Sequence, residues 1–594
     1  MGSFTNVALP KVFLITLSQL VFSVPIWAIL RLPVSASFSA DVVVAAAFGS
    51  VVLLVAVGTV CVDLFRWSEG RFSLQLPDGG TTLVCLLTGA ILACATFGST
   101  EGGNYATTLA PELALVGRLH QDTLFHTAIA NMILHEGIQS VGMDGLLPLA
   151  YHTLSHRVVG YISYCAGIPV ILGYTLILPL ILLPLLNFAF MRCLVLMRPE
   201  GYGGLGDIPA ILGGLALVYL LSAFAGSHFL SESHAMAMTF ALLALPFILH
   251  LPVSTGPIVW NLARVAWVPI AVLLTSQAKI SVGAVLACGF AWALFIVPGN
   301  LLRRAAVGFV LSIVPFFLVF FLNLQASEID GTNISIFHFL IHFPMFTLIH
   351  WLVFFIAFVF LFFNFSKIAL PWVQALIVMI LVSLVSSQIF VMGSAAYYFL
   401  NPGLWFACIV IAISAKPVDI SNWTRARQTI VVMTILVVCI VADSNRQRAV
   451  KLYSADVAAT ADRNATSIAL VVSWLNTQDL PKGTAVVIPP QVDGFWNSQV
   501  RFPCWAPSFL IPALAGVPML NGLAPEPCEI IKFYGFSAYD FAKSRSRNMA
   551  DSELCSKAIG LQLSKLAIFD EVDNRVIDCG NAAKSKSGQS YADR

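Results

Sequence analysis

Charged residues are scarce in this sequence, which excludes whole classes of protein. Asp, Glu, Lys and Arg make up 10% of the 594 residues, and 58% are hydrophobic. Soluble globular proteins carry roughly 25% charged residues, so we expect a polytopic membrane protein. The net charge of +2 and the lack of any Lys/Arg-rich run indicate no nucleic-acid partner.

Several familiar motifs are also missing. The sequence has no Cys-x-x-Cys, and no histidine follows His350, so the tail lacks the usual zinc-ligand patterns. The first apolar run, residues 12–30, lacks a small-x-small cleavage site, which favours an uncleaved first helix over a secretion signal. We see no convincing internal repeat, whereas repeats are common in transporters.

Long apolar runs are what the sequence has in abundance. Crossing a hydrocarbon core of ~30 Å takes ~20 helical residues, and about thirteen runs approach or exceed that length. Their approximate cores are residues 12–30, 42–64, 82–98, 168–191, 205–225, 235–249, 265–275, 281–297, 305–324, 346–363, 370–391, 397–415 and 430–442. The predicted fold is therefore an α-helical polytopic membrane protein, with residues 1–443 as the transmembrane domain.

The distribution of Lys and Arg predicts the orientation. If the N-terminus is cytoplasmic, the inside loops hold about twelve basic residues and the outside loops between spans about four. We therefore expect a multi-pass protein of the inner (plasma) membrane, with a large loop at 99–165 outside the cytoplasm. The tail, which follows the last span, would lie on the same side.

The tail, residues 444–594, has no membrane-length apolar run and is predicted to be a soluble α/β domain. We expect helices at 464–477 and 549–563, and short buried strands at 485–488 and 566–569. Its four cysteines allow up to two disulfides in three pairings, or free buried thiols. These cysteines are Cys504, Cys528, Cys555 and Cys579.

The loop at 99–165 concentrates titratable groups that must face water or a polar cavity. A helix is predicted to open at His120 and to close near Gly137, with Asp122 in its first turn and His126 four residues later on the same face. A glycine-rich turn at 141–145 follows. The chain then returns to the membrane through a segment that holds His152, His156 and Arg157.

These residue types suit transfer of a sugar from a lipid phosphate. Asp122 is the candidate catalytic base, since a carboxylate can take the proton of an attacking hydroxyl. Cationic groups and imidazoles can hold the departing phosphate. The candidate substrate-binding residues are His126, His152, His156, Arg157, Lys279 and Glu232.

A structural role is the alternative for each candidate. Asp122 could serve only as a helix cap, and Glu112 or Asp144 could replace it as the base. Lys279 could extend to the membrane surface. A zinc site from His152, His156 and Asp122 lacks the His-Glu-x-x-His pattern, so no metal or other cofactor is predicted, and a divalent cation stays an open alternative.

One family shares several of these motifs. Asp122-x-x-x-His126 opens the loop helix, a Gly-Leu-x-Pro-x-x-Tyr-His segment ends at His152, and Ser155-His156 precedes the next span. Together with parts of the tail at 495–496 and 512–522, this order resembles the multi-pass glycosyltransferase C superfamily. The resemblance implies a polyprenyl-phosphate sugar donor, inversion at the anomeric carbon, and a catalytic Asp in the first large external loop, where Asp122 matches.

The predicted function is thus that of a membrane glycosyltransferase of the cell envelope. It would move a sugar from a polyprenyl-phosphate carrier to an extracytoplasmic glycan, lipid or protein, as in polysaccharide biosynthesis. The alternatives are a transporter or flippase of lipid-linked sugars and a non-catalytic membrane scaffold. The sequence leaves the sugar, the acceptor and the oligomeric state open.

Overall fold

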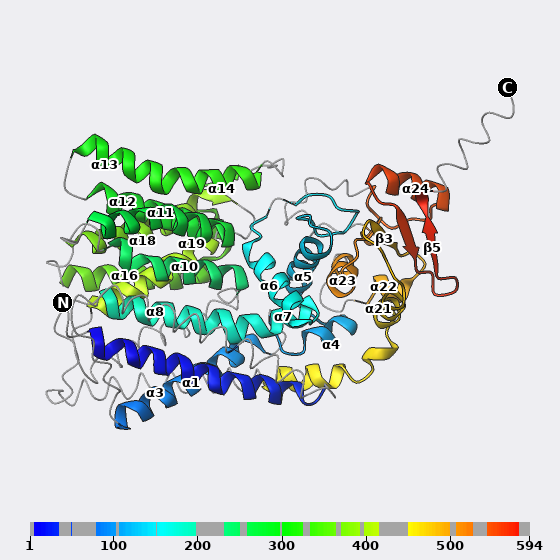
Figure 1. Ribbon diagram of the computed structural model, residues 1–594, viewed down its shortest axis with the longest axis horizontal. Coiled ribbons are helices and arrows are strands. Elements are labelled where there is room, and N and C mark those ends of the chain that lie inside the picture. The colour runs from blue at the N-terminus through cyan, green and yellow to red at the C-terminus, as the bar shows by residue number, and fades with distance from the viewer. Residues whose placement is uncertain are drawn as a thin grey trace.

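The computed structural model describes most of the chain, and the described part is mainly helical. The described residues are 5–34, 49, 79–101, 106–149, 151–197, 231–249, 258–296, 300–324, 333–363, 370–391, 397–414, 450–498, 506–526 and 543–580. Long helices run side by side toward the N-terminal end of the molecule, and the loop and the tail lie together at the opposite end (Figure 1). This arrangement places the loop and the tail on the same side of the helix bundle.

The long helices coincide with predicted apolar runs. Five continuous helical stretches in the described residues are long and apolar enough to cross a membrane, judged by length and composition. They are 11–31, 79–98, 170–197, 302–322 and 372–389. The bundle helices are α1 (Thr5–Arg31), α3 (Gly79–Thr100), α7 (Val170–Ile177), α8 (Leu183–Met197), α10 (Glu232–Leu249), α11 (Ile258–Ala278), α12 (Ile280–Phe295), α13 (Leu301–Gly308), α14 (Val314–Leu324), α16 (Pro344–Phe363), α18 (Pro371–Ile389) and α19 (Tyr397–Ser414).

Three predicted spans, 42–64, 205–225 and 430–442, lie outside the described residues apart from residue 49, so the total of thirteen stays a prediction. Two π-helical turns make longer continuous helices: η1 (Leu178–Leu182) joins α7 to α8, and η4 (Phe309–Ile313) joins α13 to α14. The prediction for 265–275 was too short, because α11 already begins at Ile258. A small pairing of β1 (Asn333–Ile334) with β2 (Phe390–Val391) and the short helix α15 (His338–His342) complete this part.

The loop contains α4 (Ala110–Leu115), α5 (Gln121–His135) and α6 (Leu154–Ala166). Helix α5 begins as predicted, but its cap is the ring of His120, whose Nδ1 accepts a hydrogen bond from the Asp122 N–H at 3.2 Å. The helix ends before Gly137, which has a φ of 78°, a left-handed conformation that glycine adopts without a steric penalty. Residues 123–133 of α5 are all buried, so this helix lies inside the protein instead of on its surface.

A three-stranded sheet organises the tail, in the order β3 (Thr484–Val487), β4 (Lys565–Ile568) and β5 (Arg575–Asp578). Strands β3 and β4 are parallel, and β4 and β5 are antiparallel. Helices α21 (Ser467–Thr477) and α24 (Asp551–Gly560) confirm the two predicted helices, and α22 (Asp493–Trp496), α23 (Pro507–Leu514) and η7 (Arg463–Ala465) are additional. Strand β5 was not predicted, because only half of its short sequence is apolar.

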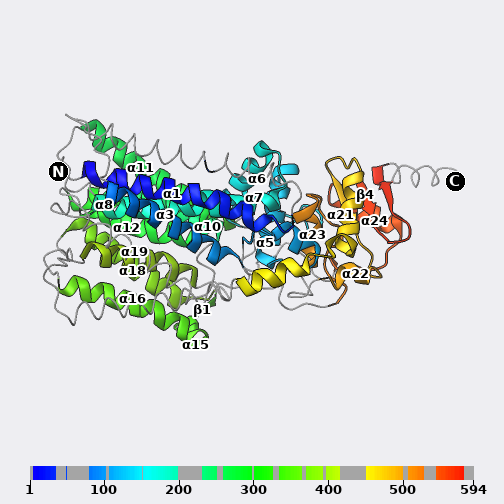
Figure 2. The same cartoon turned by 90° about the horizontal axis from the view of Figure 1, so that it is seen from below.

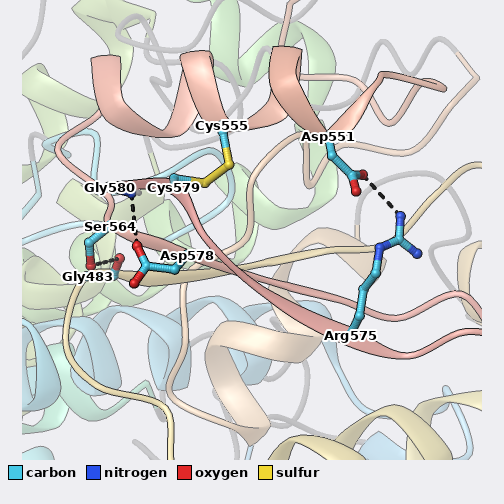
Figure 3. The surroundings of a disulfide bond; sticks show 8 residues. All are labelled: Gly483, Asp551, Cys555, Ser564, Arg575, Asp578, Cys579 and Gly580. Atoms are coloured by element: carbon cyan, nitrogen blue, oxygen red, sulfur yellow. Dashed lines mark hydrogen bonds and ion pairs between the residues drawn. A yellow bond between two sulfur atoms is a disulfide. The ribbon is translucent and has the colours of Figure 1, made fainter. Parts of the chain in front are cut away.

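One disulfide joins Cys555 of α24 to Cys579 at the end of β5 (Figure 3). Two of the four tail cysteines are thus paired with each other. The other two, Cys504 and Cys528, lie outside the described residues. Near the disulfide, Arg575 forms an ion pair with Asp551 at 3.0 Å on the exposed side of the sheet. Disulfides persist in oxidising compartments, which agrees with the predicted location of the tail outside the cytoplasm.

The tail and the loop share one hydrophobic core. Helix α23 packs along α5 (Figure 2), and the rings of Phe125 and Phe509 meet edge to face with centroids 5.6 Å apart. The Asn131 side chain donates hydrogen bonds to the carbonyl oxygens of Pro512 and Ala513 at 3.0 and 2.8 Å. The predicted boundary at residue 443 lies outside the described residues, but this packing makes the loop and the tail one structural unit.

A polar cluster reinforces the junction. The buried Asp144 carboxylate accepts hydrogen bonds from the Lys557 ammonium at 2.8 and 2.9 Å. The same carboxylate accepts from the Asn521 N–H at 2.9 Å and from the Ser544 hydroxyl at 2.6 Å. All three donors come from the tail, so a single loop carboxylate links three tail segments.

We expect Lys557→Met to destabilise the junction, because the substitution leaves the Asp144 carboxylate buried without its cation. The expected loss is about 2 kcal/mol, less than for a fully buried pair because the Lys557 side chain is 20% exposed. Thermal unfolding of the purified protein should show a lower midpoint. Arg575→Met removes an exposed ion pair and is the matched control, for which little change is expected; equal shifts for the two variants would contradict the role of Lys557.

Candidate active site

Most of the predicted site residues meet where the loop covers the end of the helix bundle. They come from four places in the chain: the start of α5, the segment that leads into α6, the first turn of α10, and the link between α11 and α12. Contacts among α5, α6 and α7, and of α10 and α11 with α6, bring these segments together. The site therefore joins loop residues to residues at the ends of bundle helices.

Three histidines form the centre of this cluster. His126 Nδ1 and His156 Nε2 are 2.5 Å apart, and the two rings are stacked with centroids 4.8 Å apart. The ring of Tyr151 stacks on His152 at 4.0 Å and meets the edge of His156 at 5.6 Å. The hydroxyl of Tyr174 donates to the His126 carbonyl oxygen at 3.1 Å, which fixes the α5 backbone at this point.

Burial keeps these imidazoles neutral. It lowers the pKa of His126 and of His156 to about 3, since desolvation disfavours the charged ring. Burial also lowers the pKa of His152 well below the usual value, and the nearby Lys279 ammonium adds to this effect. At neutral pH the cluster therefore presents uncharged rings that can donate or accept hydrogen bonds.

Lys279 is buried at the start of α12, in the link that follows α11. Its Nζ lies 3.5 Å from His152 Nε2 and 3.7 Å from the ring centroid of Tyr398 in α19. Burial lowers the pKa of Lys279 to about 8, although the carboxylates of Glu232 and Asp122 oppose this fall. A cation held in place by an aromatic face and an imidazole is thus built into the site.

Asp122 lies at the edge of the same cluster. Its side chain is 22% exposed, and its Oδ2 is 3.9 Å from His120 Nδ1. Its charge raises the pKa of His126 and of Lys279 against the effect of burial, so it lies within electrostatic range of both. The carboxylate is therefore partly accessible to solvent and within electrostatic range of the buried cation.

Glu232, at the start of α10, lies deeper. It is fully buried, and its Oε1 is 3.4 Å from His126 Nδ1 and 3.7 Å from His156 Nε2. Arg157 is different, because its side chain is exposed and makes no hydrogen bond or ion pair with the described residues. The structure thus groups His126, His152, His156, Glu232 and Lys279, with Asp122 at the edge and Arg157 outside the group.

The two alternative bases have structural partners. Glu112 is buried and accepts two hydrogen bonds from the guanidinium of Arg31, at 2.8 and 2.9 Å. Asp144 is bound to Lys557 and its neighbours in the junction described above. Both carboxylates therefore hold the loop to other parts of the chain. Asp122 does not cap its helix, because the ring of His120 provides the cap.

Sequence reasoning did not select Tyr398, Tyr151 or Ser155 as site residues. The contact of Tyr398 with Lys279 joins segments more than a hundred residues apart. Ser155 Oγ lies 3.3 Å from His156 Nδ1 and orients that ring. Tyr151 and Ser155 had a signal in the sequence, since each directly precedes a histidine of the motif.

Comparison with known proteins finds a likeness among solved structures. No protein-family model and no curated protein matches the sequence. Among solved structures, the chain is similar to ArnT from Cupriavidus metallidurans bound to undecaprenyl phosphate, with 12% sequence identity and a TM-score of 0.39. The match covers 84% of this chain and 98% of that one.

The buried histidines predict a loss of stability in acid. As the pH falls, a ring whose pKa is depressed in the folded state is protonated first in the unfolded state. The free energy of unfolding is therefore unaffected above the unfolded pKa of about 6.5 and decreases as the pH falls below it. For His152 the expected slope is up to about 1.4 kcal/mol per pH unit. Thermal unfolding from pH 7.5 to 5 should therefore show a falling midpoint, and a shallower fall for His152→Asn.

His342→Asn is the control, because it changes an exposed histidine of α15 outside the cluster. It should keep the pH dependence of the unaltered protein. An unchanged slope in His152→Asn would show that the pKa of this ring does not differ between the folded and unfolded states.

Proposed function

We propose that the protein is a membrane glycosyltransferase that moves a sugar from a polyprenyl-phosphate carrier to an acceptor hydroxyl outside the cytoplasm. The main support is the position of Lys279, a buried cation beside neutral imidazoles and within electrostatic range of the partly exposed Asp122. A cation suits the phosphate of the donor, and an accessible carboxylate suits the acceptor. The sequence motifs that resemble glycosyltransferase C proteins place the base at the same residue.

In this mechanism the donor phosphate binds beside Lys279 and His152. The ammonium and a ring N–H of His152 stabilise the negative charge that grows on the phosphate as the bond to the anomeric carbon breaks. The apolar helices at this end of the bundle contact the polyprenyl chain, and the bilayer supplies the donor. Burial of Lys279 strengthens its attraction for phosphate, because little water screens the charge.

Asp122 acts as the base on the opposite side of the reacting carbon. The acceptor oxygen attacks that carbon as its proton passes to the Asp122 carboxylate, and the bond from the carbon to the phosphate oxygen breaks. The products are the glycosylated acceptor, free polyprenyl phosphate and a protonated Asp122, which returns its proton to solvent. Attack from the face opposite the phosphate inverts the anomeric configuration.

The arrangement of the chain supports a reaction outside the cytoplasm. The loop and the tail lie at one end of the bundle (Figure 1), and the tail contains a disulfide. Both features agree with the inside location of most basic loop residues. We therefore place the N-terminus in the cytoplasm and the tail on the acceptor side, where the acceptor is a glycan, a lipid or a protein.

Asp122→Asn tests the base directly. The variant keeps the size of the side chain but cannot take a proton, so turnover should fall by roughly 10²- to 10⁴-fold. Transfer from radiolabelled polyprenyl-phosphate sugars measures turnover, and retention of the labelled donor measures binding. Donor binding should persist; normal turnover in the variant would exclude Asp122 as the base, and a scaffold would be indifferent to the substitution.

Lys279→Met should weaken donor binding by about 100-fold, because a desolvated charge contact to phosphate is worth several kcal/mol. Lys279→Arg keeps the charge and should recover part of the loss. Since the pKa of Lys279 is lowered to about 8, donor binding should decline as the pH rises through that value. The Arg variant should lose this decline; if both variants keep the pH profile of the unaltered protein, Lys279 does not hold the phosphate.

A further inference from the structure

The most unusual feature of the cluster is the environment of the Glu232 carboxylate. The residue is completely buried, and neither carboxylate oxygen has a hydrogen-bond donor among the described residues. A buried carboxylate without donors is costly, and buried polar groups in folded proteins are nearly always satisfied. The Lys279 ammonium lies within electrostatic range, but no side chain among the described residues donates a hydrogen bond to the carboxylate, so the position favours a cation or a bound group in direct contact with it.

Two imidazole nitrogens face the same point as this carboxylate. His126 Nδ1 and His156 Nε2 lie 3.4 and 3.7 Å from Glu232 Oε1 and 2.5 Å from each other. At most one proton fits between two nitrogens that are this close. The other two contacts are too long for strong hydrogen bonds, so no arrangement of protons on these rings satisfies the carboxylate well.

We propose that His126, His156 and Glu232 bind a divalent transition-metal ion, with zinc as the best match. The three ligand atoms all lie within 4.8 Å of one another, and all three residues are buried. Two imidazoles and one carboxylate form a ligand set that zinc accepts with a fourth position open. This site differs from the combination of His152, His156 and Asp122, which was considered from the sequence and not predicted.

The geometry is close to that of a tetrahedral site. Zinc bonds of about 2.0 Å place neighbouring ligand atoms about 3.3 Å apart, which is close to the 3.4 Å between Glu232 Oε1 and His126 Nδ1 and somewhat shorter than the 3.7 Å to His156 Nε2. The two ring nitrogens are closer than this, and they separate by about 0.8 Å when the ion binds. Such a shift needs only small rotations of the two rings.

The surroundings of His156 also suit a metal ligand. Its other ring nitrogen, Nδ1, lies 3.3 Å from the buried hydroxyl of Ser155. A proton on Nδ1 that is donated to this oxygen leaves the lone pair of Nε2 directed at Glu232 and His126. Metal-bound histidines commonly have such a second partner, which fixes the tautomer and the ring orientation.

The ion would connect three helices. His126 belongs to α5, His156 to α6 and Glu232 to α10, so one ion joins the loop to the membrane bundle. The inference does not rest on the proposed sugar transfer, because metal content and stability can be measured without any substrate. A metal that binds only the folded chain stabilises it by mass action.

The test is the metal content of the full-length protein, purified without chelators and with an affinity tag that lacks histidine. We expect about one zinc ion per chain, its loss on treatment with a strong chelator, a lower unfolding midpoint after that loss, and recovery on adding zinc alone. Cobalt added to the stripped protein should give the intense visible absorption of a tetrahedral ion. Glu232→Gln and His156→Asn should each lower zinc affinity by at least tenfold.

His152→Asn is the matched control, since it removes a buried imidazole next to the site but none of the three ligands. It should keep one zinc ion per chain. Should a ligand variant fail to fold, the chelation and cobalt measurements on the unaltered protein still decide. A protein without stoichiometric metal whose midpoint ignores both chelator and zinc would overturn the proposal, as would full zinc retention in Glu232→Gln and His156→Asn.

Discussion

The packing of helix α5 between the tail and the membrane bundle is the contact on which the site depends. On one side, Phe125 meets Phe509 and Asn131 bonds to the backbone of α23. On the other side, α6 and α7 cover the helix. Because residues 123–133 of α5 are buried on all faces of the helix, the direction of Asp122 and His126 is set by two different parts of the chain.

Several of the buried charges in the described residues occur in groups. In an apolar chain each buried charge is costly unless it is paired or hydrogen-bonded. Arg31 with Glu112, and Asp144 with Lys557, hold the loop. The group around Lys279 and Glu232 lacks such simple pairing, and buried charges that do not merely connect segments are the ones that mark functional sites.

Much of the local structure could be predicted from the sequence. The start of α5, the helices α21 and α24 and the strands β3 and β4 follow from apolar periodicity and end signals, which act over a few residues. Strand β5 was missed because its pairing with β4 comes from the fold and not from its own residues. The shared core of loop and tail was missed for the same reason, since the contacts join residues nearly four hundred positions apart.

The candidate site divides in the same way. The sequence by itself determined that the protein is an apolar, many-helix chain with one polar loop, and it identified the residue types in that loop, because hydrophobic runs and scarce charges are local properties. Only the tertiary structure decided that Glu232 faces His126 and His156, that Tyr398 covers Lys279, and that Arg157 lies outside the group. These relations depend on how helices from distant segments pack, and side-chain direction across such contacts is not encoded in any single stretch of sequence.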